Sequence, residues 1–214
     1  MSDFAGEEAA RAIRSALERC NARAAFGLPG AGNQVLFQAL RSSGIRLVVP
    51  THELAAAFMA GAYGRVANLP GILLTIRGPG FAYALAGIAE AWQDSAPLVH
   101  IVSAPPEERH LRHRHQALDQ AAIVRPIVKA VFGVTEPADL YETVRLAFEA
   151  ARSGEPGPVV VQLGAKVDTE ALGPMPMTLS VKWSLVSLRA YLVLMIALVF
   201  YRVLALAGVF GGTR

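Results

Sequence analysis

The feature that most constrains the fold is the alternation of short apolar segments with longer amphipathic ones between residues 7 and 163. Residues 7–23 carry apolar side chains at three- and four-residue spacing, which predicts a helix. The same pattern predicts helices over 33–42, 53–66, 81–92 and 138–152. Short apolar runs bounded by Gly and Pro predict strands at 24–26, 45–49, 71–76, 98–102, 128–134 and 159–163.

This alternation is typical of βαβ crossover units, in which the strands run parallel and helices cover both faces of the sheet. We therefore predict an α/β fold with three layers and about six strands, most of them parallel. We expect this domain to occupy residues 1–170, followed by a linker at 171–182 and a hydrophobic tail at 183–214 that forms a C-terminal helix.

The composition indicates which partners and which cell compartment to expect. The formal net charge is +3, but the Lys and Arg residues are scattered between apolar segments, so we do not expect nucleic-acid binding. One cysteine, Cys20, allows no internal disulfide, which favours a reducing compartment. The first residues are acidic and do not resemble a signal peptide, so the expected location is the cytoplasm.

Three predicted strands are followed by loops rich in glycine and proline. Ligands of open α/β sheets lie beyond the carboxyl ends of the strands, where glycine lets the backbone approach them closely. Each loop alone is also compatible with an ordinary strand-to-helix turn. Their shared edge favours a binding site formed by Gly27-Leu28-Pro29-Gly30, Pro50-Thr51-His52-Glu53 and Arg77-Gly78-Pro79-Gly80.

Glu53 opens a helix that has no other charge before Arg65. A carboxylate there either caps the helix and gains from its dipole, or acts as a reagent. As a reagent it would be a desolvated carboxyl that holds or shares a proton near neutrality. The position of Glu53 in the first turn of a helix favours the capping role, whereas the glycine-rich loops around it favour the role of a reagent.

Four groups of residues occur in an order that matches a known family: Phe26-Gly27-Leu28-Pro29-Gly30, His52-Glu53 with Gly61-Ala62-Tyr63-Gly64-Arg65, Gly78-Pro79-Gly80, and Gln93-Asp94-Ser95-Ala96-Pro97-Leu98-Val99. With them the chain resembles the N-terminal pyrimidine-binding domain of thiamine diphosphate (ThDP) dependent enzymes. It is most similar to the group of acetolactate synthase, benzoylformate decarboxylase and benzaldehyde lyase, over about residues 11–167. Arg77 and His115 depart from the family's usual residues, which leaves the substrate open.

The resemblance implies a catalytic role for Glu53, whose counterpart in the family hydrogen-bonds N1′ of the cofactor's aminopyrimidine. Proton sharing there promotes removal of the thiazolium C2 proton, and a desolvated carboxyl suits that task. His52 beside it either positions substrate or ends the strand. Gln116 is expected to reach the reacting atoms.

The resemblance also implies which backbone lies against the cofactor. Pro29 and Gly30 are expected to line the reaction cavity. The segment Gly78-Pro79-Gly80 is expected to pass close to the pyrimidine ring.

Histidines at 110, 113 and 115 raise the question of a metal site. Three arginines in the same segment would repel a divalent cation, and the segment contains no Cys, Asp or Glu. We therefore expect no metal site in this chain. A basic loop that meets an anionic 2-oxo acid is the better interpretation.

The resemblance further implies a second domain that binds Mg²⁺ and the diphosphate through Gly-Asp-Gly, a motif that does not occur in this sequence. Metal and diphosphate would then come from a partner subunit, or the holoenzyme would not form. A homodimer or larger oligomer through the face of the pyrimidine domain is expected. FAD binding stays open, because flavin contacts in acetolactate synthases come largely from a domain not found in these residues.

The apolar run at 190–210, broken by Arg202, has the length of a membrane-spanning helix. A membrane-associated protein is therefore the alternative to a cytoplasmic one. A truncated or frame-shifted gene, or a helix packed in a core, would also explain the run.

Two functional hypotheses follow. The first is a ThDP-binding module of an acetolactate synthase-like carboligase or decarboxylase that acts on 2-oxo acids such as pyruvate. The second is a truncated, non-catalytic fragment or association subunit. An unrelated nucleotide-binding protein is disfavoured, because neither Gly-x-Gly-x-x-Gly nor a phosphate-loop Lys follows a strand.

Overall fold

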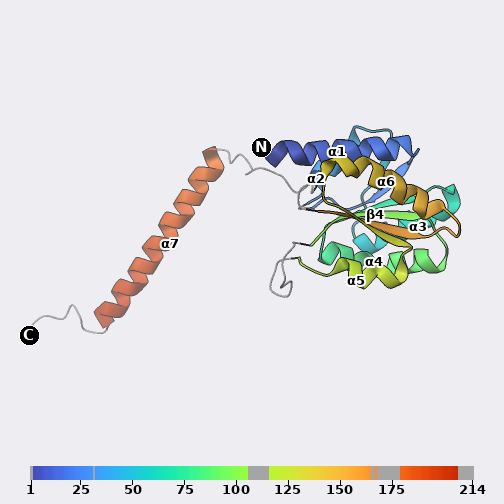
Figure 1. Cartoon of the computed structure of the whole chain (residues 1–214). Coiled ribbons are helices and arrows are strands. Elements are labelled where there is room, and N and C mark those ends of the chain that lie inside the picture. The colour runs from blue at the N-terminus through green and yellow to red at the C-terminus, as the bar shows by residue number, and fades with distance from the viewer. Residues whose placement is uncertain (1, 31, 106–115, 165–166, 168–178, 207–214) are drawn as a thin grey trace, which may run out of the picture. The chain divides into compact units, whose positions relative to one another are not determined.

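The computed structural model describes residues 2–30, 32–105, 116–164, 167 and 179–206 (Figure 1). The chain divides into two compact units, Met1–Gly173 and Pro174–Arg214. Most of the linker expected at 171–182 lies outside the described residues, as do the histidines at 110, 113 and 115. The second unit contains one described helix, α7, over Leu179–Leu206.

The first unit is built on a six-stranded sheet in the order β2-β1-β3-β4-β6-β5. Every neighbouring pair of strands is parallel, which confirms the predicted α/β fold. The strands are β1 (Ala24–Gly27), β2 (Arg46–Val48), β3 (Gly71–Thr75), β4 (Leu98–Ser103), β5 (Ala130–Val134) and β6 (Pro158–Leu163).

Helices cover both faces of the sheet, giving the three expected layers (Figure 1). One face carries α1 (Ser2–Arg19), α2 (Gln34–Arg41) and α6 (Pro137–Arg152). The other carries α3 (Glu53–Ala67), α4 (Pro79–Gln93) and α5 (Gln120–Val124), which runs into a 3-10 turn over Arg125–Ile127. The sequence pattern predicts all of these except α5 and the 3-10 turn.

The hydrophobic core lies on both sides of the central strands. Strands β3 and β4 are buried along their whole length, because each is paired on both edges and covered on both faces. Their side chains therefore alternate between two clusters: Ile72, Leu74, Val99 and Ile101 face α1, α2 and α6, whereas Leu73, Leu98 and Val102 face α3 and α4.

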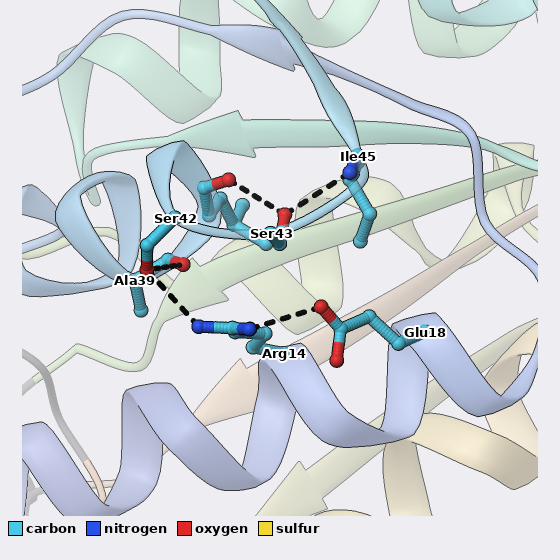
Figure 2. Close-up of polar contacts among 7 residues, drawn as sticks. Arg14, Glu18, Ala39, Ser42, Ser43 and Ile45 are labelled. Carbon is cyan, nitrogen blue, oxygen red and sulfur yellow. Dashed lines mark hydrogen bonds and ion pairs between the residues drawn. The ribbon is translucent and has the colours of Figure 1, made fainter.

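A polar contact joins α1 to the end of α2 (Figure 2). Both helices lie on the face of the sheet opposite α3 and α4. Arg14 donates through Nε to Glu18 Oε1 at 3.0 Å and through Nη1 to Ser42 Oγ at 3.0 Å. The neighbouring Ser43 hydroxyl donates to Leu40 O and accepts from the Ile45 N–H, which turns the chain from α2 into β2. The ion pair between Arg14 and Glu18 is partly exposed to water, so we expect it to add little to the stability of the fold.

Helices α3 and α4 approach each other closely, because small residues line their contact. A Cβ at Gly87 would lie 2.6 Å from Ala57 Cβ, so α4 packs directly on the backbone of α3. Near the end of α3, a Cβ at Gly64 would lie 2.1 Å from the Pro97 carbonyl oxygen. A side chain at Gly87 would push α4 away from α3, and one at Gly64 would push the end of α3 away from the segment that leads into β4.

His100 is a histidine buried in the core on the same side as α3 and α4. Its Nε2 lies 2.8 Å from Thr75 Oγ1, and its ring stacks on Phe81 at 5.8 Å between centroids. Its Nδ1 has no hydrogen-bond partner among the described residues. Burial lowers the pKa of His100 from 6.5 to about 3, so the folded protein holds the neutral ring.

The close contact at Gly64 predicts a large effect of a single methyl group. Gly64→Ala should lower the free energy of unfolding by about 1–3 kcal/mol, because the Pro97 carbonyl belongs to the backbone and cannot rotate away. Gly44→Ala is the matched control, since nothing lies within 4 Å of a Cβ there. Urea unfolding with a mild detergent measures both; equal stability of the two variants would contradict the packing.

Burial of His100 predicts loss of stability in acid. Its folded pKa lies below its unfolded one, so the unfolded chain binds more protons, and stability falls as pH drops below about 6.5 towards 3. Between pH 7.5 and 5 this loss should be about 2 kcal/mol. His100→Gln should remove that part of the loss and the exposed control His52→Gln should not, as measured by urea unfolding at the two pH values. An unchanged pH dependence in His100→Gln would contradict the assignment.

Candidate active site

The candidate site lies at the carboxyl ends of β1, β2 and β3. Strands β1 and β3 are neighbours, and the connections that follow them lead in opposite directions along the sheet, from β1 to β2 and from β3 to β4. Such a switch point is where open α/β sheets bind ligands. The loops at 28–33, 49–52 and 76–78 all begin at this edge.

The first loop is held by Asn33, which precedes α2. Asn33 is buried; its Oδ1 accepts from the Gly30 N–H at 2.8 Å and its Nδ2 donates to Leu28 O at 3.0 Å. The side chain therefore closes the loop instead of capping α2. Pro29 is left exposed at the tip of the loop and Gly30 is half-buried.

The cap of α3 is His52, not Glu53. His52 has an extended backbone, and its Nδ1 accepts from the Leu54 N–H at 3.1 Å. Its ring is exposed and lies 5.1 Å from that of Tyr83 on α4. Because Nδ1 is occupied by the cap, His52 has a structural task that accounts for its position.

Glu53 is the first residue of α3 and is half-buried. Its carboxylate has no hydrogen-bond or ion-pair partner among the residues the structure describes. The helix N-terminus stabilises negative charge at this position. Since His52 supplies the cap, the Glu53 carboxylate is available for another group.

Ile76 brings the first and third loops together beside Glu53. A Cβ at Gly30 would lie 2.7 Å from Ile76 Cγ2, and a Cβ at Gly80 would lie 2.6 Å from Ile76 Cγ1. The same position at Gly80 is 3.2 Å from Glu53 Oε1. The carboxylate therefore lies against the bare backbone of Gly80, at the start of α4.

The third loop is fixed from below by Gln120, which is fully buried. Its Oε1 accepts from the Gly78 N–H at 3.0 Å, and its Nε2 donates to Ser103 O, at the end of β4, also at 3.0 Å. Gly78 caps α4 with φ 67°, which favours glycine, and Pro79 follows at the first turn of the helix. Gln120 therefore ties the third loop to the end of β4, and Gly78 and Pro79 set how the loop enters α4.

Gln116 lies directly on Gly78. A Cβ at Gly78 would be 2.7 Å from both Cα and the carbonyl oxygen of Gln116. Gln116 itself has φ 57°, a left-handed backbone that is uncommon for a residue with a side chain. Close packing of the two backbones therefore needs glycine at position 78.

The structure gathers most of the residues that the sequence singles out. Glu53, Gly30 and Gly80 meet around Ile76, and Gln116 lies on Gly78. Pro29 and Pro79 are exposed at the same edge. Sequence reasoning did not single out Asn33, Ile76 and Gln120; only Asn33, close behind Gly30, carried a signal, as a residue type common in loops.

Comparison with known proteins decides the family. Residues 7–123 match the model of the thiamine pyrophosphate enzyme, N-terminal TPP binding domain. The chain belongs to this family. Thiamine pyrophosphate is another name for ThDP, so the matched domain is one that binds this cofactor.

Acetolactate synthases are among the relatives of this TPP-binding domain. The catabolic acetolactate synthase of Raoultella terrigena is 37% identical over 151 residues, which cover 71% of this chain and 27% of the relative. The acetolactate synthase of Bacillus subtilis is 35% identical over 145 residues, covering 68% and 25%. The TPP-binding domain thus spans about a quarter of the length of these relatives.

The hydrogen bonds of Gln120 predict a measurable role in holding the site. Gln120→Leu removes the acceptor of the buried Gly78 N–H and the donor to the Ser103 carbonyl, which should lower the free energy of unfolding by roughly 2–4 kcal/mol. Gln38→Leu, at an exposed position of α2, is the control and should change it by less than about 0.5 kcal/mol. Urea unfolding tests both; a neutral Gln120→Leu would contradict the proposed support of the loop.

Proposed function

We propose that this domain supplies the pyrimidine-binding half of a ThDP site in an acetolactate synthase-like carboligase or decarboxylase that acts on 2-oxo acids. The observation that carries the proposal is the Glu53 carboxylate. It is half-buried at the N-terminus of α3, lies against the backbone of Gly80 and has no partner among the described residues. The relatives of the chain described above are named as acetolactate synthases, which supports 2-oxo acids as the substrate class.

The residues at this edge fit an aminopyrimidine ring. The ring needs a flat surface beside it and a carboxyl group at its N1′ nitrogen. Glu53 provides a carboxyl with no competing partner among the described residues, next to the backbone of Gly80. Gly78 and Gly80 are buried, and their lack of side chains lets Gln116 and Ile76 pack directly on this loop. When bound, ThDP supplies the carbanion chemistry of its thiazolium C2 atom.

In this proposal Glu53 holds or donates the proton at N1′. The carboxylate that remains after donation is stabilised by the dipole of α3. General acid–base catalysis by one carboxyl of this kind contributes about 10²–10⁴-fold in rate.

The neighbouring residues would orient the ring and line the cavity. Gln120 holds the Gly78 N–H, and we propose that the backbone of Gly78-Pro79-Gly80 bounds one side of the pyrimidine site. We assign Pro29 and Gly30 to the lining of the cavity, and Gln116, which packs on Gly78, to the side of the reacting atoms. His52 keeps its capping role, which leaves substrate positioning as a secondary proposal.

Gly-Asp-Gly does not occur in these 214 residues, and in this proposal a partner holds the diphosphate and Mg²⁺. We propose that this partner, in a homodimer or with a separate diphosphate-binding subunit, docks on α3 and α4. Large apolar side chains are exposed on these helices, among them Phe58, Met59, Tyr83 and Trp92. Exposed groups of this kind mark interaction surfaces when they gather on one face.

A second candidate function is a non-catalytic association subunit. It is supported by the large apolar side chains exposed on α3 and α4, which offer a surface for association that needs no cofactor. The two functions differ in whether Glu53 affects the chemistry of a bound cofactor.

The experiment is exchange of the thiazolium C2 hydrogen for deuterium, followed by NMR. The full chain is co-expressed with the part of the Bacillus subtilis acetolactate synthase that this chain does not match, and ThDP and Mg²⁺ are added. Glu53→Gln should slow exchange by about 10²–10⁴-fold relative to the unsubstituted complex, because the amide cannot hand over a proton.

Glu8→Gln is the matched control, since Glu8 is an exposed carboxylate on α1, away from the α3 and α4 surface that this proposal uses. It should leave exchange unchanged. The chain by itself should show no exchange above that of free ThDP. Unchanged exchange in Glu53→Gln would refute the role of Glu53, whereas a complex that binds ThDP without accelerating exchange would favour the association subunit.

A further inference from the structure

The second unit of the chain contains a helix that the proposed cofactor site does not use. Within α7, the segment Val186–Ala205 is 20 residues long, apolar, and not buried. We propose that this segment crosses a lipid bilayer as a single transmembrane helix and attaches the TPP-binding domain to a membrane. The proposal does not depend on the function proposed for Glu53.

The length of the segment matches the thickness of a bilayer. At about 1.5 Å per residue, a helix of 20 residues is about 30 Å long, which equals the hydrocarbon thickness of a typical membrane. A helix also satisfies its own backbone hydrogen bonds, which lipid requires.

The segment is apolar on every side. Successive residues of a helix point about 100° apart, so four in a row cover the full circumference. Leu194, Met195, Ile196 and Ala197 are all apolar, and the exposed fractions of Met195 and Ile196 are 40% and 69%. A helix lying in the plane of a membrane surface needs a polar face, which this segment does not have.

The uniform apolar surface also favours lipid over a protein partner. Pairing with one other helix, such as a second copy of α7, would cover one side and leave the remaining apolar side chains in water. A bilayer covers all sides at once. We therefore assign the bilayer as the occupant and treat self-association as an outcome of the test.

The ends of α7 carry the residue types that suit a membrane interface. Trp183 and Tyr201 are exposed and lie about 27 Å apart along the helix. Arg189 and Arg202 bound an uncharged stretch of 12 residues, about 18 Å long. This stretch is shorter than the hydrocarbon layer of about 30 Å, and half of the difference is about 6 Å at each end. The flexible side chain of each arginine can reach that far and place its guanidinium among anionic lipid phosphates.

The test uses cell-free synthesis of the full chain with phosphatidylcholine–phosphatidylglycerol vesicles. The expected result is a chain that floats with the vesicles and resists extraction by alkaline carbonate. Ile196→Arg, at the middle of the segment, should lower the resistant fraction at least tenfold. The matched control Ile123→Arg places the same charge on the exposed face of α5 and should leave it unchanged.

A chain that sinks, or that carbonate releases, would overturn the proposal, and so would an Ile196→Arg variant that behaves like the unsubstituted protein. Sinking as a defined oligomer would point to self-association of α7.

Spanning is separated from surface binding by labelling with a membrane-impermeant maleimide. In a Cys20→Ser background, Ser184→Cys and Thr213→Cys each introduce the only thiol, one before and one after the segment. On sealed vesicles, only one of the two variants should react. Equal reaction of both would overturn the transmembrane assignment.

Discussion

The direct contact between α3 and α4 is the constraint on which the rest of the site depends. Gly87 lets α4 rest on Ala57, and Gly64 lets the end of α3 reach the Pro97 carbonyl. With both helices fixed this closely, their first turns lie side by side. Glu53 is the first residue of α3 and Gly80 lies in the first turn of α4, so helix packing far from the site determines how the carboxylate meets the glycine backbone.

Much of this architecture could be predicted from the sequence, because the physical signals are local. Apolar runs between Gly and Pro predicted the strands, and helical spacing predicted the longer helices. Predictions failed where a residue acts through distant partners: Gln120 joins Gly78 to the end of β4, and nothing near it in the sequence indicates those partners. The choice between cap and reagent at Glu53 likewise needed the ring orientation of His52.

The two units of the chain obey different physical rules. In the TPP-binding domain apolar side chains are hidden between a sheet and its helices, and the unusual groups are buried polar ones such as His100. In α7 the apolar side chains face outward. Both units have a role if α7 attaches the TPP-binding domain to a membrane and a partner that carries the diphosphate site binds the domain at that membrane.

The central claim is that the Glu53 carboxyl is the group that meets the aminopyrimidine of ThDP. The most direct measurement is an experimental structure of the full chain with ThDP, Mg²⁺ and a diphosphate-binding partner. The account predicts a carboxyl oxygen of Glu53 within about 2.6–3.2 Å of N1′, with the ring beside the backbone of Gly78 and Gly80. An aminopyrimidine bound elsewhere, or a Glu53 carboxyl paired with another protein group, would contradict it.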